Sequence, residues 1–124
     1  MLNRLRKYLS QSPEARREHS AGWKGAFVRD AEGLTAFQRQ CESTTSAWLA
    51  QRALSLTERQ LHTIPDNQYV SARVGDTALV VWFHDDTIGI DEGGKGTRLE
   101  HWDFADPAAM LAAFRDVLAE HLEG

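Results

Sequence analysis

The feature that most constrains the fold is a series of short β-type segments between Tyr69 and Phe104. Residues 69–74 alternate between apolar and polar, and residues 77–84 are rich in β-branched and aromatic residues, which favour strands. The expected strands cover residues 69–74, 77–84, 87–92 and 98–104. Turn residues separate them at Gly75-Asp76, at Asp85-Asp86 and in the glycine-rich residues 93–96. Because such short connections join neighbouring strands in opposite directions, the sequence predicts a four-stranded antiparallel meander.

The alternation also predicts which side chains share a face of this sheet, because paired residues point to the same side. The expected pairs are Phe83 with Ile88, Val81 with Ile90 and, across a four-residue glycine loop, Ile90 with Leu99. The predicted core face carries Leu79, Val81, Phe83, Ile88, Ile90 and Leu99. The opposite face carries Val80, Trp82, His84, Asp91, Arg98, Glu100, Trp102 and Phe104. A slip of one residue in either turn would exchange the two faces.

On this second face, three cross-strand neighbours are expected. They are Trp82 with Gly89, Asp91 with Arg98, and Trp102 with Thr87. Large aromatic side chains beside charged ones are typical of protein interfaces. The same tryptophans would instead be core residues if the N-terminal helices packed on this face, and the sequence leaves both interpretations open.

Helical patterns flank the predicted sheet. Asp106-Pro107 supplies an N-cap and a first helical residue. The stripe that follows contains Met110, Leu111, Phe114, Val117, Leu118, His121 and Leu122. We expect this C-terminal helix to pack on the sheet, which is the nearest apolar surface.

The first half of the chain is predicted to be mainly helical. The spacing of three leucines indicates a short amphipathic helix over residues 2–9, and a Ser-Pro start indicates a second over 13–21. A longer helix is expected over 34–54. Thr57, with Gln60 three residues later, matches a capping box and indicates a further helical turn that starts at Thr57. Residues 22–33 fit either a short strand or an ordered loop.

The length and composition indicate one domain. The chain has 124 residues, of which 42% are hydrophobic and 26% charged, as in ordinary globular proteins. The turn after Ile64 divides this domain, residues 1–124, into a mainly helical part, 1–64, and a second part, 65–124. The predicted fold class is α+β, with N-terminal helices, a four-stranded antiparallel meander and a C-terminal helix packed on the sheet.

Cysteine and hydropathy patterns exclude several classes of protein. Cys41 is the only cysteine, so neither an intrachain disulfide nor a multi-cysteine zinc site is possible. No apolar run is long enough to span a membrane. The basic N-terminus lacks the apolar run of a signal peptide. We therefore expect a cytoplasmic protein that does not contact a membrane.

Charge is unevenly distributed along the chain, whose net charge is −4. Residues 1–60 contain ten Lys and Arg against six Asp and Glu, whereas residues 61–124 contain four against twelve. The acidic half argues against nucleic acid as a ligand, because phosphate binding needs a basic face. The acidity favours a cationic partner, or it serves solubility alone.

No motif indicates catalysis. His84-Asp85-Asp86 lies at a predicted hairpin tip, where aspartate is favoured by the turn itself, and a metal site needs ligands from more than one segment. The glycine-rich residues 91–96 lack the spacing of a phosphate-binding loop. Cys41 has no neighbouring base in the sequence and is expected to be a buried thiol. We predict no catalytic residue, no metal site and no cofactor.

Three features of the second half carry a resemblance to a known class. They are the strand 79–83, the acidic turns at Asp85-Asp86 and Asp91-Glu92, and the helix after Asp106-Pro107. In size, acidity and layout the chain resembles the small cytoplasmic bacterial immunity proteins. The resemblance implies a protein-binding inhibitor that occludes the active site of a toxin with a cationic surface. The contact residues that it implies are Trp82, Trp102, Asp85, Asp86, Asp91 and Glu100.

Two other functions are compatible with the sequence. The first is a small-molecule-binding domain or enzyme with a pocket between sheet and helices, whose polar groups would be His84, His101 and Asp103. The second is a secretion chaperone, which predicts a homodimer. A concave pocket with converging polar side chains would favour the first, and an acidic, aromatic surface patch would favour the inhibitor.

Overall fold

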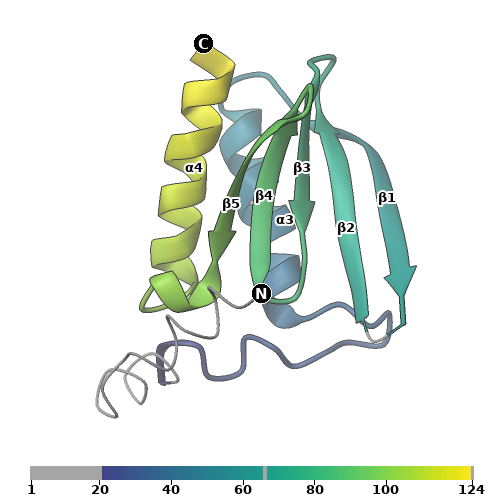
Figure 1. Cartoon of the computed structure of the whole chain (residues 1–124), viewed down its shortest axis with the longest axis vertical. Helices are drawn as coiled ribbons and strands as arrows, with labels where there is room; N and C mark the ends of the chain where they lie inside the picture. Colours follow the sequence, from purple (N-terminus) through teal and green to yellow (C-terminus); the bar gives the residue numbers. More distant parts are fainter. Residues whose placement is uncertain (1–20, 66, 124) are drawn as a thin grey trace.

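The computed structural model describes residues 21–65 and 67–123 and has an α+β fold (Figure 1). The helices are α3 (Ala36–Ala50) and α4 (Pro107–Glu123), with a short 3₁₀ turn, η1 (His101–Asp103), before α4. The strands are β1 (Leu56–Ile64), β2 (Asn67–Val74), β3 (Leu79–Phe83), β4 (Thr87–Glu92) and β5 (Lys95–Glu100). They form one antiparallel sheet in sequence order, β1-β2-β3-β4-β5. The predicted meander is therefore confirmed, but it has five strands.

The N-terminal part differs from the expectation of several helices. In the described part of the chain one helix, α3, precedes the sheet. It is shorter than the predicted span of 34–54, because Thr35 caps its start and the helix ends at Ala50. The helices predicted over 2–9 and 13–21 fall on residues 1–20, outside the described residues, apart from the last position.

The predicted helical turn at Thr57 is wrong, because residues 56–64 form β1. This strand pairs with β2 from Leu56 opposite Val74 to Ile64 opposite Asn67, with a bulge between Thr57 and Gln60. The Thr57 hydroxyl donates to the Gly75 carbonyl at 2.9 Å instead of capping a helix. Pairing with β2 thus outweighs the local capping pattern, and the turn after Ile64 lies inside a hairpin.

The central hairpin has the predicted register, whereas the last one does not. Phe83 pairs with Ile88, and Trp82 with Gly89. The sequence predicts a four-residue loop between β4 and β5. Gly93 and Gly94, with φ values of 59° and 87°, form a two-residue turn there instead. Arg98 consequently pairs with Gly89 rather than Asp91. The shift is two residues, so every side chain of β5 keeps its predicted face.

The last strand also ends earlier than predicted. The expected strand 98–104 is wrong beyond Glu100, where the Asp86 carbonyl accepts the His101 N–H at 3.0 Å and the chain turns into η1. Trp102 and Phe104 therefore leave the sheet. The Phe104 carbonyl accepts a hydrogen bond from the Trp23 indole at 2.9 Å, which ties this corner to the loop before α3.

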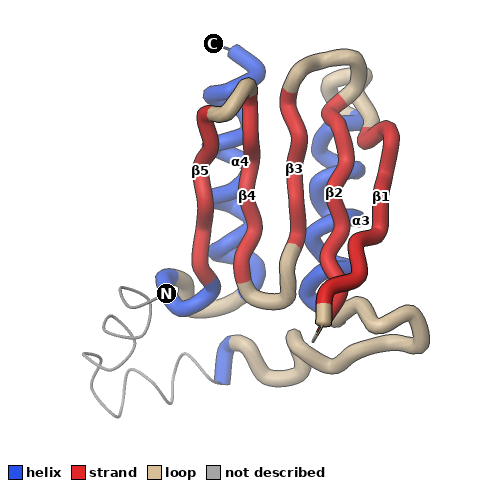
Figure 2. The backbone as a smooth tube through the Cα atoms, turned by 45° about the vertical axis from the view of Figure 1, so that its right-hand side comes forward, coloured by secondary structure: helices blue, strands red, loops and turns tan. Residues whose placement is uncertain are grey.

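Both helices cover the same face of the sheet (Figures 1 and 2). The start of α4 is as predicted, with the Asp106 carboxylate accepting the Ala109 N–H at 2.8 Å. The largest fully buried apolar side chains between the two layers are Phe37, Phe83, Phe114, Leu34, Leu49, Leu79, Ile88, Ile90, Met110, Leu118 and Val70. Cys41 is buried here, as expected, and burial raises the pKa of its thiol. Neither described helix is long and apolar enough to cross a membrane.

Residues 22–33, which the sequence left open, form an ordered loop with an isolated bridge between Arg29 and Thr35. Trp23 is 4% exposed and lies edge-on to Phe37, with ring centroids 5.0 Å apart. The Arg29 guanidinium reaches Asp85 in the β3–β4 turn at 2.5 Å. This loop therefore supports the end of the sheet where β3 and β4 meet.

A buried amide joins α3 to the sheet. Gln38 is fully buried, and its side-chain amide donates to the carbonyls of Gln68 at 2.7 Å and Phe83 at 3.0 Å. Its side-chain oxygen accepts the Thr35 N–H at 2.8 Å. The Gln38 side chain thus completes the N-cap of α3 and donates hydrogen bonds to one backbone carbonyl of β2 and one of β3.

We expect Gln38→Leu to destabilise the fold by about 2–4 kcal/mol, because it leaves buried backbone groups without partners. Chemical denaturation measures the change in the free energy of unfolding. Gln40→Leu, at an exposed position of the same helix, is the matched control and should change stability little. Equal effects of the two substitutions would contradict this role of Gln38.

Candidate functional site: the open face of the sheet

The candidate site is the face of the sheet that α3 and α4 leave uncovered (Figure 2). We call it the open face. It is defined by His62, Tyr69, Ser71, Val80, Trp82, His84, Asp91 and Arg98. These side chains alternate along their strands with the buried aliphatic residues of the core. In the central strand, for example, Val81 and Phe83 are fully buried while Trp82 between them is half-buried on the other side.

Aromatic rings stack across the open face from one strand to the next. His62 of β1 stacks on Tyr69 of β2, with ring centroids 4.3 Å apart and planes 9° from parallel. Tyr69 stacks in turn on His84, which follows β3, at 4.1 Å and 11°. The Trp82 indole meets His84 edge-on at 5.2 Å. These four rings form a continuous stack, which we call the ring stack.

Trp82 is held in place by the residue opposite it. Its indole lies on Gly89 of β4, where a Cβ atom would come within 2.2 Å of a ring carbon. The Arg98 guanidinium lies 5.7 Å from the centroid of this indole, at cation–π distance. The predicted outward direction of Trp82 is therefore confirmed, and the side chain is packed against the sheet rather than free.

The two imidazoles of the ring stack have different surroundings. The pKa of His84 is lowered, chiefly because burial disfavours the charged form. Asp85 and Asp86 oppose this shift, while Arg98 and His62 add to it. The His62 ring is oriented by Ser71, whose hydroxyl lies 2.8 Å from Nε2. The lowered pKa favours the uncharged imidazole of His84, and an uncharged ring is suited to stacking.

A shallow hollow of about 650 Å³ lies on the open face, over Trp82 and the adjoining parts of β4 and β5. Val80 of β3 and Gly96 of β5 line it together with the four rings of the ring stack, and its charged side chains are Arg98 and Asp91. In the residues that the structure describes, no group of His, Cys, Asp and Glu is arranged to hold a metal ion. Aromatic surface with one cation and one anion can bind by stacking, apolar contact and ion pairing.

The structure brings only some of the predicted contact residues to this face. Trp82 and Asp91 lie on it, and Glu100 lies at the end of β5, opposite Thr87. Asp85 is engaged by Arg29. Asp86 lies 3.8 Å from His101, at the same end of the sheet. Asp91 therefore lies on the open face, whereas Asp85 and Asp86 lie in the turn at one end of the sheet.

Trp102 is not a member of the open face. It lies in η1, with its ring centroid 5.0 Å from that of His101. Sequence reasoning also missed His62 and Tyr69, because it interpreted residues 57–60 as helical and left β2 without its outer partner. The signal that could have placed Tyr69 on the open face is its alternation with Val70, which is buried.

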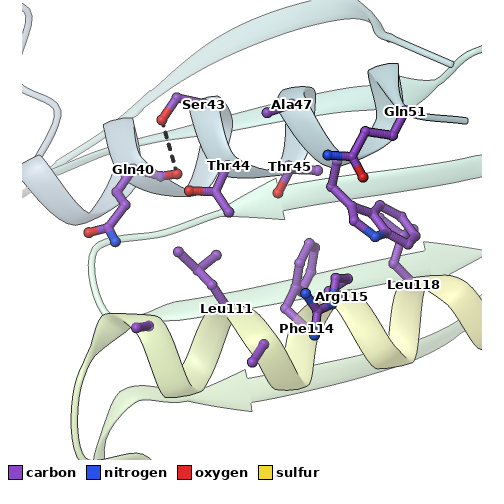
Figure 3. A pocket seen from close by; sticks show the side chains of 13 residues that line it. Gln40, Ser43, Thr44, Thr45, Ala47, Gln51, Leu111, Phe114, Arg115 and Leu118 are labelled. Atoms are coloured by element: carbon purple, nitrogen blue, oxygen red, sulfur yellow. Dashed lines mark hydrogen bonds between the residues drawn. The ribbon is translucent and has the colours of Figure 1, made fainter. Parts of the chain in front are cut away.

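A second hollow, of about 570 Å³, runs between the two helices (Figure 3). Thr44 and Thr45 of α3 and Leu111 and Phe114 of α4 point into it. Its other polar groups, among them Arg115, lie along the rim of a mainly apolar floor. This groove offers surface for packing and no converging reactive groups.

The residues proposed for a sheet–helix pocket are dispersed. The space between sheet and helices is filled by Phe37, Phe83 and Phe114, all almost fully buried. His84 lines the hollow of the open face, which neither His101 nor Asp103 lines. His101 instead packs edge-on to Trp23, with centroids 5.3 Å apart.

Comparison of the chain with protein-family models, with curated proteins and with solved structures finds no match. The site is therefore interpreted from its own geometry.

The contact between Trp82 and Gly89 should be visible as an energetic coupling. Gly89→Ala is expected to cost about 1–3 kcal/mol, because the new methyl group displaces the indole. In a Trp82→Ala background the same change should be neutral or stabilising, since alanine loses less entropy than glycine in a strand. A double-mutant cycle of unfolding free energies measures the difference, and strict additivity would contradict the contact.

The lowered pKa of His84 should make the fold less stable in acid. The unfolded chain binds the His84 proton more readily than the folded one, so stability falls as pH drops below about 6.5 and levels off below the folded-state pKa. We expect the free energy of unfolding of His84→Gln to fall less between pH 7.5 and 5 than that of the unaltered chain. Parallel pH profiles for the two proteins would argue against a depressed pKa.

Proposed function

We propose that this chain is a protein-binding inhibitor of the immunity type, which uses the open face to cover the active site of a toxin. The observation that carries the proposal is the ring stack on a sheet face that neither α3 nor α4 covers. Trp, Tyr and Arg side chains supply most of the energy in protein interfaces, and Trp82, Tyr69 and Arg98 lie together here.

The state of these side chains favours binding over simple exposure. The rings already contact one another, and Trp82 packs on Gly89 with Arg98 at cation–π distance. A partner that packs on them therefore immobilises few free rotamers, which lowers the entropic cost of association. The shape also suits a macromolecule, because the hollow is shallow and lies on a broad sheet.

The charge distribution supports a partner with a cationic surface. The described residues after position 60 are rich in Asp and Glu, and Asp91 and Glu100 flank the aromatic centre. Carboxylates at the rim of an interface mainly accelerate association with a positively charged partner. Aromatic anchors in the centre then slow dissociation, which is the arrangement that a tight inhibitor needs.

A small-molecule function has weaker support. The polar groups that would serve it, His84, His101 and Asp103, do not converge on one hollow. The interior between sheet and helices is occupied by aromatic side chains. The arrangement of these residues therefore supports a protein-binding inhibitor better than a small-molecule function.

The proposal predicts a specific genetic interaction. Expressed alone, the protein encoded by the neighbouring reading frame should stop bacterial growth, and co-expression of this chain should restore it. Trp82→Ala should abolish the protection and weaken binding at least about 30-fold, the effect of losing an interface anchor of about 2 kcal/mol.

The matched control is Trp48→Ala, which removes a half-buried indole from α3, where Arg52 lies 4.5 Å from the ring centroid. This variant should still protect, and both variants should keep a cooperative thermal transition. If Trp82→Ala unfolds, Arg98→Glu alters the same face at an exposed position. A harmless neighbouring protein, or full protection by the open-face variants, would refute the proposal.

A further inference from the structure

In the described part of the chain, the outer edge of β1 pairs with no other strand. β1 is the first strand of the sheet and pairs with β2 alone among the strands, and no described element lies beyond it (Figures 1 and 2). An edge of this kind presents a row of backbone N–H and C=O groups that can pair with another strand.

The two halves of this edge differ. The first half contains the bulge between Thr57 and Gln60, with Glu58 at a φ of 52°, and such distortion prevents regular pairing. From Gln60 to Ile64 the strand keeps an unbroken register with β2. This stretch contains no Lys, Arg, Asp, Glu or Pro, which are the residues that commonly protect strand edges.

Apolar side chains on this regular stretch are exposed on both sides of the strand. Leu61 is 41% exposed on the helix side, and Ile64 is 37% exposed on the side of the open face. The other two large hydrophobic residues exposed in the described ranges, Phe27 and Val28, lie in the loop before α3. The pairing-competent part of the edge is thus also its apolar part.

The charges beside Leu61 indicate which strand would pair there. On the helix side, Arg59 binds Glu42 at 2.5 Å, and Arg39 binds Asp30 and Glu32 at 2.6 Å. A two-fold axis brings such a patch against itself. A patch of one sign would repel its own copy, whereas a patch of both signs allows opposite charges of the two copies to meet.

We propose that β1 pairs with β1 of a second copy of this chain, antiparallel and centred on His62. Leu61 then lies opposite Thr63 of the second copy on the helix side, and Gln60 lies opposite Ile64 on the other. Paired residues keep the same face, so the sheet runs without break through both copies. The open faces join, and the two ring stacks meet at His62.

Sedimentation equilibrium of the purified full chain tests this pairing. We expect the mass to rise from 13.9 kDa to twice that value as the concentration increases. Leu61→Lys and Thr63→Lys each place a charge in the pairing edge and should raise the dimer dissociation constant at least about tenfold. Two variants are used so that the result does not depend on one of them folding.

Val28→Lys is the matched control, because Val28 is 67% exposed and belongs to the loop before α3 rather than to β1. It should leave the dimer unchanged. A chain that stays monomeric at every concentration overturns the proposal, and so does a dimer that both edge variants leave intact. The experiment uses the chain alone, so its outcome is independent of whether the open face binds a toxin.

Discussion

The structure depends on the fact that successive residues of a strand point to opposite faces, while helices cover only one of those faces. The strand Leu79–Phe83 shows this most directly. Leu79, Val81 and Phe83 are almost wholly buried under the helices, whereas Val80 and Trp82 lie on the open face. All five residues are apolar, so the strand itself is hydrophobic on both sides. One face of the strand is buried in the core, and the other face is part of the open face.

The open face is ordered without a second covering layer. Its rings pack on one another and on Gly89, contacts that are worth about 0.5–1.5 kcal/mol per aromatic pair. Only a glycine at position 89 lets the indole of Trp82 lie flat on the sheet. The lowered pKa of His84 belongs to the same arrangement, because partial burial favours an uncharged imidazole. Local packing thus holds the rings in place on a face that no helix of the described chain covers.

The loop before α3 gives the acidic residues a second role. Arg29 engages Asp85, and the Trp23 indole binds the carbonyl of Phe104, so the loop fastens the β3–β4 turn and the end of β5. Gln38 adds bonds from the start of α3 to backbone groups at the same end of β2 and β3. Part of the acidity therefore serves the fold, while Asp91 and Glu100 lie on β4 and β5 outside these contacts.

Local signals in the sequence determined the α+β class, the start of α4 at Asp106-Pro107, the pairing of β3 with β4 and the outward direction of Trp82. Each depends on residues close together in the chain, through a cap, a two-residue turn or the alternation of a strand. Tertiary structure decided the rest. β1 forms because β2 offers it a partner, although Thr57 and Gln60 alone favour a helix. Glycines in the last turn permit two registers, and the chain leaves the sheet before Trp102 because His101 bonds to Asp86. The ring stack needs β1, β2 and β3 side by side. Contacts between distant segments add energies that no local pattern contains, and for that reason only the folded chain reveals them.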